Sequence, residues 1–154
     1  MIEDCVRTAV VTGASRGIGL ATAKLLASRG YLVIACSRSC SDGLDALMAT
    51  NPSVSFIQLD LADPESVKAC AQGLHKEYGH IDALINSAGV ASGGLFAMTR
   101  IDDMRRVFDV NYFNQILFTQ YVAKKMVRAK AGAIVNIASV AGLRADAGTL
   151  AYGG

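Results

Sequence analysis

The stretch Thr12-Gly13-Ala14-Ser15-Arg16-Gly17-Ile18-Gly19 decides the fold, because it joins a short β-branched strand to a helical segment. A strand that turns sharply into a helix leaves the first N–H groups of the helix pointing at the turn, where they bind anions. Glycine is needed there because a Cβ would block a pyrophosphate or the contact between helix and strand. The stretch therefore predicts the phosphate turn of a dinucleotide-binding βαβ unit. The residues expected to bind are Gly13, Ser15, Arg16, Gly17, Ile18 and Gly19.

Short apolar strands alternate with longer helical segments along the whole chain. The expected strands cover 8–12, 31–36, 54–59, 81–86 and 133–138, and the expected helices cover 17–29, 42–49, 64–78 and 101–129. This pattern predicts a single domain over residues 1–154, an α/β fold of the Rossmann type. We expect a doubly wound parallel sheet in three α/β/α layers, incomplete at about five strands, with order 3-2-1-4-5. A (β/α)₈ barrel needs about 250 residues and is excluded by length.

Composition places the chain among compact globular proteins, with 52% apolar residues, 18% charged residues and a net charge of +2. The N-terminus does not resemble a signal peptide, and no apolar run approaches the roughly 18 residues of a membrane span. The densest basic stretch is expected to form the solvated face and last turn of a helix, so we predict neither a nucleic-acid nor a membrane partner. That stretch comprises Lys124, Lys125, Arg128 and Lys130.

The four cysteines form no C-x-x-C pair and have no histidine cluster nearby. We therefore predict no metal site and no disulfide framework. Reduced thiols are typical of proteins in reducing compartments, which indicates a cytoplasmic location.

The end of the second expected strand carries Ser37-Arg38, with Arg38 nineteen positions after Gly19. Folds that bind NAD usually place an acid about 20 residues on, where it accepts from the ribose hydroxyls. An acid would repel a 2′-phosphate, whereas an arginine binds it through charge-assisted hydrogen bonds. Arg16 could approach the same phosphate from the glycine turn. These residues predict NADP(H) rather than NAD, although two solvated surface arginines remain the alternative.

Five pieces of sequence at consistent spacing resemble the short-chain dehydrogenase/reductase family over the whole chain. They are T-G-A-S-R-G-I-G at residues 12–19, Asp60 after the third strand, Asn86-Ser87-Ala88-Gly89 after the fourth, Asn111 in the long helix, and Ser139 after the fifth. Tyr152 stands thirteen residues beyond Ser139, as the family's serine and tyrosine usually do. The family's usual N-N-A-G is N-S-A-G here, a small change in a structural loop.

The resemblance implies reversible hydride transfer between a nicotinamide and a carbonyl or alcohol. It implies that Tyr152 is the acid/base, that Ser139 bonds the substrate oxygen, and that Asn111 holds a helix kink and an ordered water. Asp60 would bond the adenine amino group, and its alternative role is a turn cap. The cofactor contacts implied beyond the glycine turn are Ser37, Arg38, Asp60, Leu61, Asn86, Ala88 and Gly89. The resemblance also implies a small-molecule carbonyl substrate and assembly into a homo-oligomer.

The family also places a lysine four residues after the tyrosine, where its ammonium favours phenolate. The printed sequence reaches Gly154, two residues short of that position. We therefore expect an inactive fragment of a longer reductase, whose fifth strand forms a bare sheet edge. A shortened expression product, a proteolytic fragment and a half-length gene product would all give this sequence. A non-catalytic NADP-binding module is the alternative function, and a methyltransferase-like Rossmann protein is disfavoured by Arg38, Asn111, Ser139 and Tyr152.

Overall fold

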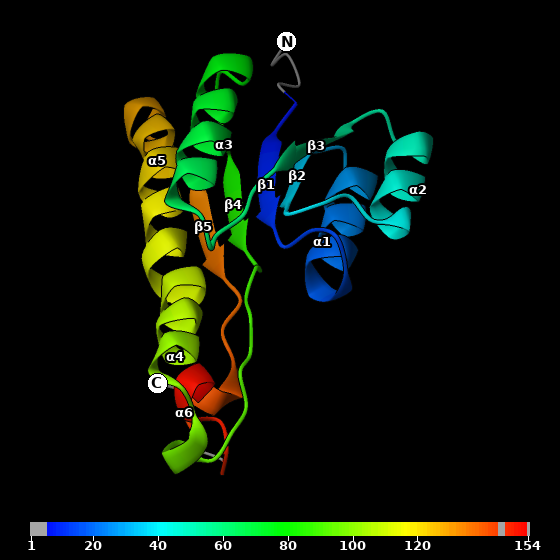
Figure 1. Ribbon diagram of the computed structural model, residues 1–154. Coiled ribbons are helices and arrows are strands. Elements are labelled where there is room, and N and C mark those ends of the chain that lie inside the picture. Colours follow the sequence, from blue (N-terminus) through cyan, green and yellow to red (C-terminus); the bar gives the residue numbers. More distant parts are fainter. Residues whose placement is uncertain (1–5, 145–146, 154) are drawn as a thin grey trace.

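The computed structural model describes residues 6–144 and 147–153, which fold as helices around one sheet (Figure 1). The strands are β1 (Thr8–Thr12), β2 (Leu32–Ser37), β3 (Val54–Gln58), β4 (Ala83–Asn86) and β5 (Ala133–Asn136). The helices are α1 (Gly17–Ser28), α2 (Asp42–Thr50), α3 (Pro64–Glu77), α4 (Ile101–Phe108), α5 (Asn114–Ala129) and α6 (Leu150–Gly153). A π-helical turn (Asp109–Phe113) joins α4 to α5, and 3₁₀ turns lie at Phe96–Met98 and Val140–Gly142.

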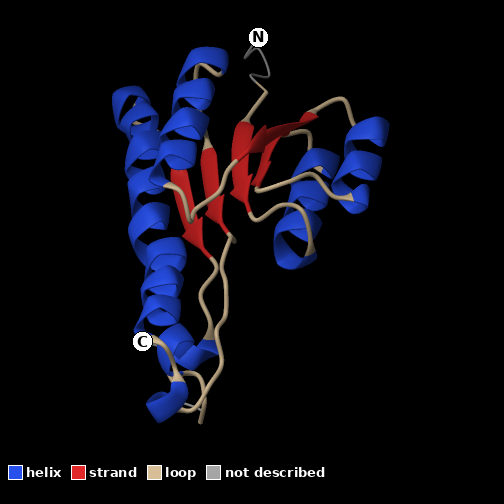
Figure 2. Cartoon of the chain, in the orientation of Figure 1, coloured by secondary structure: helices blue, strands red, loops and turns tan. Residues whose placement is uncertain are grey.

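The sheet has five parallel strands in the order β3-β2-β1-β4-β5, as the sequence predicts (Figure 2). β1 lies at the centre, where Val10 is in register with Ile34 of β2 and with Leu84 of β4. The chain crosses from β3 over β2 and β1 to reach β4, so the strand order reverses beside β1. Ligands of doubly wound folds bind at such a reversal, outside the carboxyl ends of the strands.

The two faces of the sheet bury different helices, because successive strand residues point to opposite sides. Val10 and Ile34 pack in one apolar cluster with residues of α3 and α5. Val11 and Ala35 pack in the other cluster with residues of α1 and α2. All five residues of β1 are buried, as a central parallel strand requires.

β5 is exposed along its whole length, with Ile134 42% and Val135 48% accessible. Figure 1 shows α1 and α2 beside β2 and β3, away from β5, whereas α5 lies beside β5. Among the described residues β5 is the last strand of the sheet, so the bare edge expected from the sequence is present there. Exposed apolar strand edges of this kind favour pairing with another chain.

The helix starts follow the sequence signals. Asp63 caps α3, since its Oδ1 accepts from the amide of Glu65 at 3.0 Å, and Pro64 occupies the first helical position. Gly30 follows α1 with φ of +80°, the left-handed conformation of a C′ glycine. The long helix expected over 101–129 is not continuous, because the π-helical turn interrupts it.

The expectation of a solvated basic stretch is wrong for Lys125. This side chain is buried on the same helix face as Phe118, Val122 and Met126. Its ammonium donates to the carbonyl of Tyr78 and to those of His75 and Gly79, at 3.2 and 3.4 Å. These carbonyls lie at the C-terminal end of α3, where a cation is favourable.

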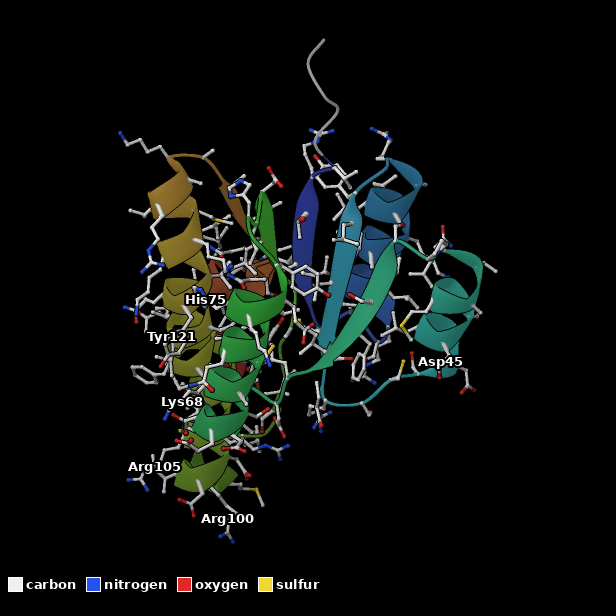
Figure 3. All side chains as sticks on the ribbon, turned by 90° about the horizontal axis from the view of Figure 1, so that it is seen from above. Asp45, Lys68, His75, Arg100, Arg105 and Tyr121 are labelled. Carbon is white, nitrogen blue, oxygen red and sulfur yellow. The ribbon has the colours of Figure 1, made fainter. Side chains whose placement is uncertain are left out.

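A second contact joins the same helices, since His75 Nε2 donates to the carbonyl of Tyr121 at 3.0 Å. His75 and Tyr121 lie on neighbouring helices, α3 and α5 (Figure 3). Within the described ranges, no helix has the length and apolar character needed to cross a membrane.

Candidate cofactor and active site

The glycine turn between β1 and α1 leaves no room for side chains at two of its positions. Gly13 has φ of +67°, and a Cβ there would lie 2.8 Å from the Cα of Ala88. A Cβ on Gly19 would overlap the carbonyl of Gly13. Gly17 has open space around it, but its φ of +55° favours glycine. The backbone of this turn can therefore approach a ligand closely.

α1 begins at this turn without a capping side chain in the described part of the chain. Arg16 is the N-cap residue with an extended backbone, and the first turn carries no acid. Its amide groups and the positive end of the helix dipole therefore remain suited to an anion.

Thr12 ties the end of β1 to the loop that follows β4. Its Oγ1 accepts from the amides of Ser87 and Ala88, at 3.0 and 3.1 Å. The same hydroxyl donates to the carbonyl of Ile85 at 3.5 Å. One threonine thus fixes the N-S-A-G loop against the glycine turn.

A cleft of about 920 Å³ opens at the carboxyl ends of the strands. It brings together residues from both halves of the chain, and its size is typical of small-molecule sites. The residues that the sequence predicted and that line it are Gly13, Ser15, Arg16, Gly17, Ile18, Gly19, Ser37, Arg38, Asp60, Leu61, Ala88, Gly89, Asn111, Ser139 and Tyr152.

Asn86 differs from the other predicted residues, because it lies inside the sheet and is 1% exposed. Its Nδ2 donates to Thr119 Oγ1 at 2.9 Å and to Asn136 Oδ1 at 2.8 Å. Asn86 and Asn136 are register partners on β4 and β5. Its position supports the sheet beneath the cleft rather than lining it.

The end of β2 carries the residues that the sequence assigned to a 2′-phosphate. Ser37 is buried and donates through Oγ to the carbonyl of Ser39 at 2.9 Å. Arg38 is exposed, and its carbonyl accepts from Gln58 Nε2 at 3.1 Å. Among the described residues, neither Arg38 nor Arg16 forms a salt bridge. Both guanidinium groups can therefore meet an anion in the cleft.

Of the two roles considered for Asp60 from the sequence, the turn cap is observed in the structure. Its Oδ1 accepts from the amide of Ala62 at 2.9 Å, which is the turn cap. The residue also lines the cleft, where its second carboxylate oxygen can accept from an adenine amino group.

Asn111 lies in the π-helical turn and forms two hydrogen bonds with Val90. Its Oδ1 accepts from the amide of Val90 and its Nδ2 donates to the carbonyl, both at 2.8 Å. π-Helical turns inside helices often mark functional sites. Here the turn places an asparagine side chain against a loop of the cleft.

Ser139 and Tyr152 come from segments after β5 and line the same cleft as Asn111. Ser139 Oγ accepts from the amide of Ala141 at 3.2 Å, so its own hydroxyl hydrogen stays available to donate. Tyr152 is half-buried on α6. The arrangement presents two hydroxyl groups to a ligand.

Sequence reasoning did not predict several lining residues as contacts, of which Ser39, Ser87, Arg106 and Gln115 carry polar side chains. Gln115 lies one helical turn after Asn111, and its Oε1 is buried without a hydrogen-bond partner in the described structure. Helical spacing from Asn111 could have found Gln115. The other lining residues not predicted as contacts are Cys36, Leu59, Ala62, Val90, Ala91, Val110, Ile137, Ala138 and Gly142.

Cys36 is a fully buried cysteine beside the cleft. The hydrogen bond with Cys70, 4.0 Å between sulfur atoms, and then burial raise the pKa of the Cys36 thiol well above its usual value. A protonated buried thiol is a poor nucleophile. Cys36 therefore belongs to the packing rather than to the chemistry of the site.

The parallel sheet, the glycine turn and the cleft at the strand ends define a nucleotide-binding α/β protein of the Rossmann class. A sequence profile described as short chain dehydrogenase matches residues 7–154. The chain belongs to the short-chain dehydrogenase/reductase family of oxidoreductases, whose members bind a nicotinamide cofactor.

Curated relatives match this chain as part of longer chains. A 3-oxoacyl-[acyl-carrier-protein] reductase of Synechocystis is 34% identical over 150 residues, covering 95% of this chain and 61% of the relative. The mouse dehydrogenase/reductase SDR family member 7B is 33% identical over 141 residues, covering 86% of this chain and 43% of its own. The chain spans about 60% of the length of the reductases that it matches.

Solved structures agree with this assignment. A short-chain dehydrogenase from Streptomyces avermitilis superposes with a TM-score of 0.92 at 32% identity, over 99% of this chain and 56% of that one. A 3-oxoacyl-[acyl-carrier protein] reductase from Brucella melitensis, in complex with NAD, gives 0.86 at 30% identity, over 96% and 61%.

Proposed function

We propose that this chain carries the cofactor-binding part of an NADP(H)-dependent short-chain oxidoreductase, which transfers hydride between the nicotinamide and a ketone or secondary alcohol. The observation that carries the NADP preference is the pair Arg16 and Arg38, both lining the cleft and both free of salt bridges among the described residues. An arginine in place of an acid at the end of β2 favours a 2′-phosphate.

The residues of the cleft fit such a cofactor. Gly13 and Gly19 stand where a Cβ would collide with backbone, so the turn can seat a pyrophosphate over the start of α1. Asp60 and Leu61 line the part of the cleft that we assign to the adenine, and the small residues Ala88 and Gly89 would let the backbone approach the dinucleotide. A bound nicotinamide cofactor supplies or accepts the hydride.

The chain's own side chains would handle the substrate oxygen and the proton. The Ser139 hydroxyl, whose Oγ already accepts from Ala141, donates to the oxygen where charge develops. Tyr152 transfers the proton at its phenolic oxygen as acid or base. Asn111, held by Val90, maintains the π-helical turn beside them.

The substrate class is proposed as a carbonyl compound, with 3-oxoacyl thioesters as one candidate. Reductases named for that substrate are 30–35% identical to this chain, and general carbonyl reduction is the alternative. The proposal includes a cytoplasmic location, supported by the free thiols of Cys36, Cys40 and Cys70. It includes a homo-oligomer but no nucleic-acid partner.

The test of cofactor preference is Arg38→Asp, with NADPH and NADH dissociation constants measured by calorimetry. Losing a charge-assisted contact of about 1.5–3 kcal/mol weakens NADPH about 10- to 100-fold, while NADH changes far less. Arg29→Asp is the matched control, since Arg29 is exposed at the C-cap of α1 and makes the same charge change. Equal losses for both cofactors would contradict the assignment.

A non-catalytic NADP-binding module is the second candidate. The position four residues after Tyr152, where the family has its lysine, falls outside the printed sequence. We expect these 154 residues to bind NADPH with little or no turnover, because losing an acid/base partner can cost about 10²–10⁴-fold. Robust NADPH-linked ketone reduction by this chain would refute that expectation. Turnover by a longer chain, abolished by Tyr152→Phe, would exclude the non-catalytic module.

A further inference from the structure

Ser41, which sequence reasoning did not single out, makes two hydrogen bonds with one hydroxyl. It is the N-cap of α2, where its Oγ accepts from the amide of Leu44 at 3.3 Å. The same Oγ donates to the carbonyl of Ser15 at 2.5 Å, across 26 residues of sequence. The first bond belongs to the helix, whereas the second reaches the glycine turn.

The second bond joins the two backbone segments that carry the phosphate-binding arginines. Ser15 precedes Arg16, and Ser41 follows Arg38 by three residues. Gln58 of β3 holds the loop on its other side, through the carbonyl of Arg38. The Ser41–Ser15 contact therefore adds a side-chain bond between the two segments, which the backbone bond from Ala14 to the carbonyl of Cys36 also joins.

Ser41 stands on a well-packed element. Leu44 is fully buried, and Gly43 lies so close to α1 that a Cβ there would come within 2.9 Å of Leu20 Cδ2. The loop itself offers little packing, since Arg38 and Ser39 are exposed. Two long side chains bind one phosphate more tightly when the backbone segments that carry them are held in place before binding.

We propose that Ser41 is a positioning residue for the 2′-phosphate: its bond to Ser15 holds the Arg16 and Arg38 segments at the spacing that one phosphate requires. This inference rests on the proposed NADP(H) preference. An N-cap that served only the stability of α2 would not discriminate between nucleotides with and without that phosphate.

The test compares adenosine 2′,5′-bisphosphate with adenosine 5′-monophosphate, which differ only in the 2′-phosphate, by calorimetry on the 154-residue chain. Ser41→Ala should weaken the bisphosphate about fivefold, as expected for one lost hydrogen bond, and the monophosphate less than twofold. Ser41→Thr, which restores a hydroxyl, should stay within about twofold of the unmodified chain for both.

Asp63→Ala is the matched control, because it removes the N-cap of α3 and leaves the Ser41–Ser15 bond intact. It should affect both nucleotides equally. Ser41→Gly carries the same expectation as Ser41→Ala at a smaller cost to the helix, which covers the case that the alanine variant unfolds.

The possible outcomes distinguish a failure of the Ser41 inference from a failure of the proposed NADP(H) preference. If the unmodified chain binds both nucleotides equally, the 2′-phosphate site itself is refuted. If it prefers the bisphosphate and both Ser41→Ala and Ser41→Gly keep that full preference, the role of Ser41 is refuted and the NADP(H) preference stands.

Discussion

Asn111 and Val90 exchange two hydrogen bonds across 21 residues of sequence, each 2.8 Å long. The side-chain amide satisfies both backbone groups of Val90, in the loop after β4. The contact connects the π-helical turn to a wall of the cleft, so the helix and the loop hold one another in place.

Asn111→Asp should loosen this contact, because a carboxylate keeps the acceptor for the Val90 amide but repels the Val90 carbonyl. We expect the free energy of unfolding to fall by about 1–3 kcal/mol, as for a half-buried polar group left unpaired. Urea denaturation measures this change. Gln120→Glu makes the same amide-to-carboxylate change at an exposed position of α5 and should cost under about 0.5 kcal/mol. Equal effects would mean that the exchange with Val90 contributes nothing.

Lys125→Met should destabilise the chain more than a substitution at a solvent-exposed lysine would. The change removes the ammonium that satisfies carbonyls at the end of α3, and we expect a loss of about 2–3 kcal/mol in urea unfolding. Lys124→Met is the control, since Lys124 is exposed and its ammonium lies 5.1 Å from the ring of Tyr121. A loss no greater than that of Lys124→Met would show that the buried ammonium is not stabilising.

Cys40 offers a prediction on pH dependence. Its Sγ donates to Asp45 Oδ1 at 3.0 Å, and Asp45 lies on α2 (Figure 3). Desolvation and then this carboxylate raise the pKa of the Cys40 thiol, so less thiolate is present at a given pH. Asp45→Asn should shift the alkylation rate profile toward lower pH, because the thiol then ionises more readily.

The experiment uses iodoacetamide with Cys5→Ser as background, so that Cys5 does not contribute to the measured rate. Asp42→Asn removes the same charge from the first turn of α2 without touching the thiol, and serves as control. A profile unmoved by Asp45→Asn, or moved equally by both variants, would contradict the assigned cause.

Self-association is expected through one of two apolar surfaces. One is the helix face around Phe113 and Ile116, and the other is the β5 edge around Val135. Ile116 and Val135 are comparably exposed, at 41% and 48%, so Ile116→Lys and Val135→Lys form a matched pair. Whichever variant lowers the sedimentation coefficient toward the monomer value identifies the surface. A monodisperse unmodified monomer would refute both.

The sequence predicted most of the fold because its signals were local. The β-branched run 8–12 is β1 in the structure, and the Asp63-Pro64 start of α3 is confirmed. The fifth strand is shorter than the predicted 133–138, since β4 ends at Asn86 and its loop turns toward Thr12. β5 therefore ends where β4, its partner strand, leaves the sheet.

The candidate site was predictable where glycine, arginine and family spacing marked it. Lys125 was mispredicted because charge was weighed above its helical position, although Phe118 and Val122 share its face. Ser41 was missed for a different reason. Its partner lies 26 residues away, and a serine beside a helix start looks like an ordinary cap in the sequence.

The hydrogen bonds from the amides of Ser87 and Ala88 to Thr12 determine the order in which the parts of the cleft can come together. During synthesis the glycine turn leaves the ribosome early, while the loop that closes over Gly13 follows only after about 75 more residues. Until β4 has been synthesised, β1 can pair with β2 alone and its other edge stays unpaired. Domains generally fold as units. A polypeptide that ends before residue 88 would therefore contain the whole phosphate turn but lack the Ala88 backbone that packs against Gly13.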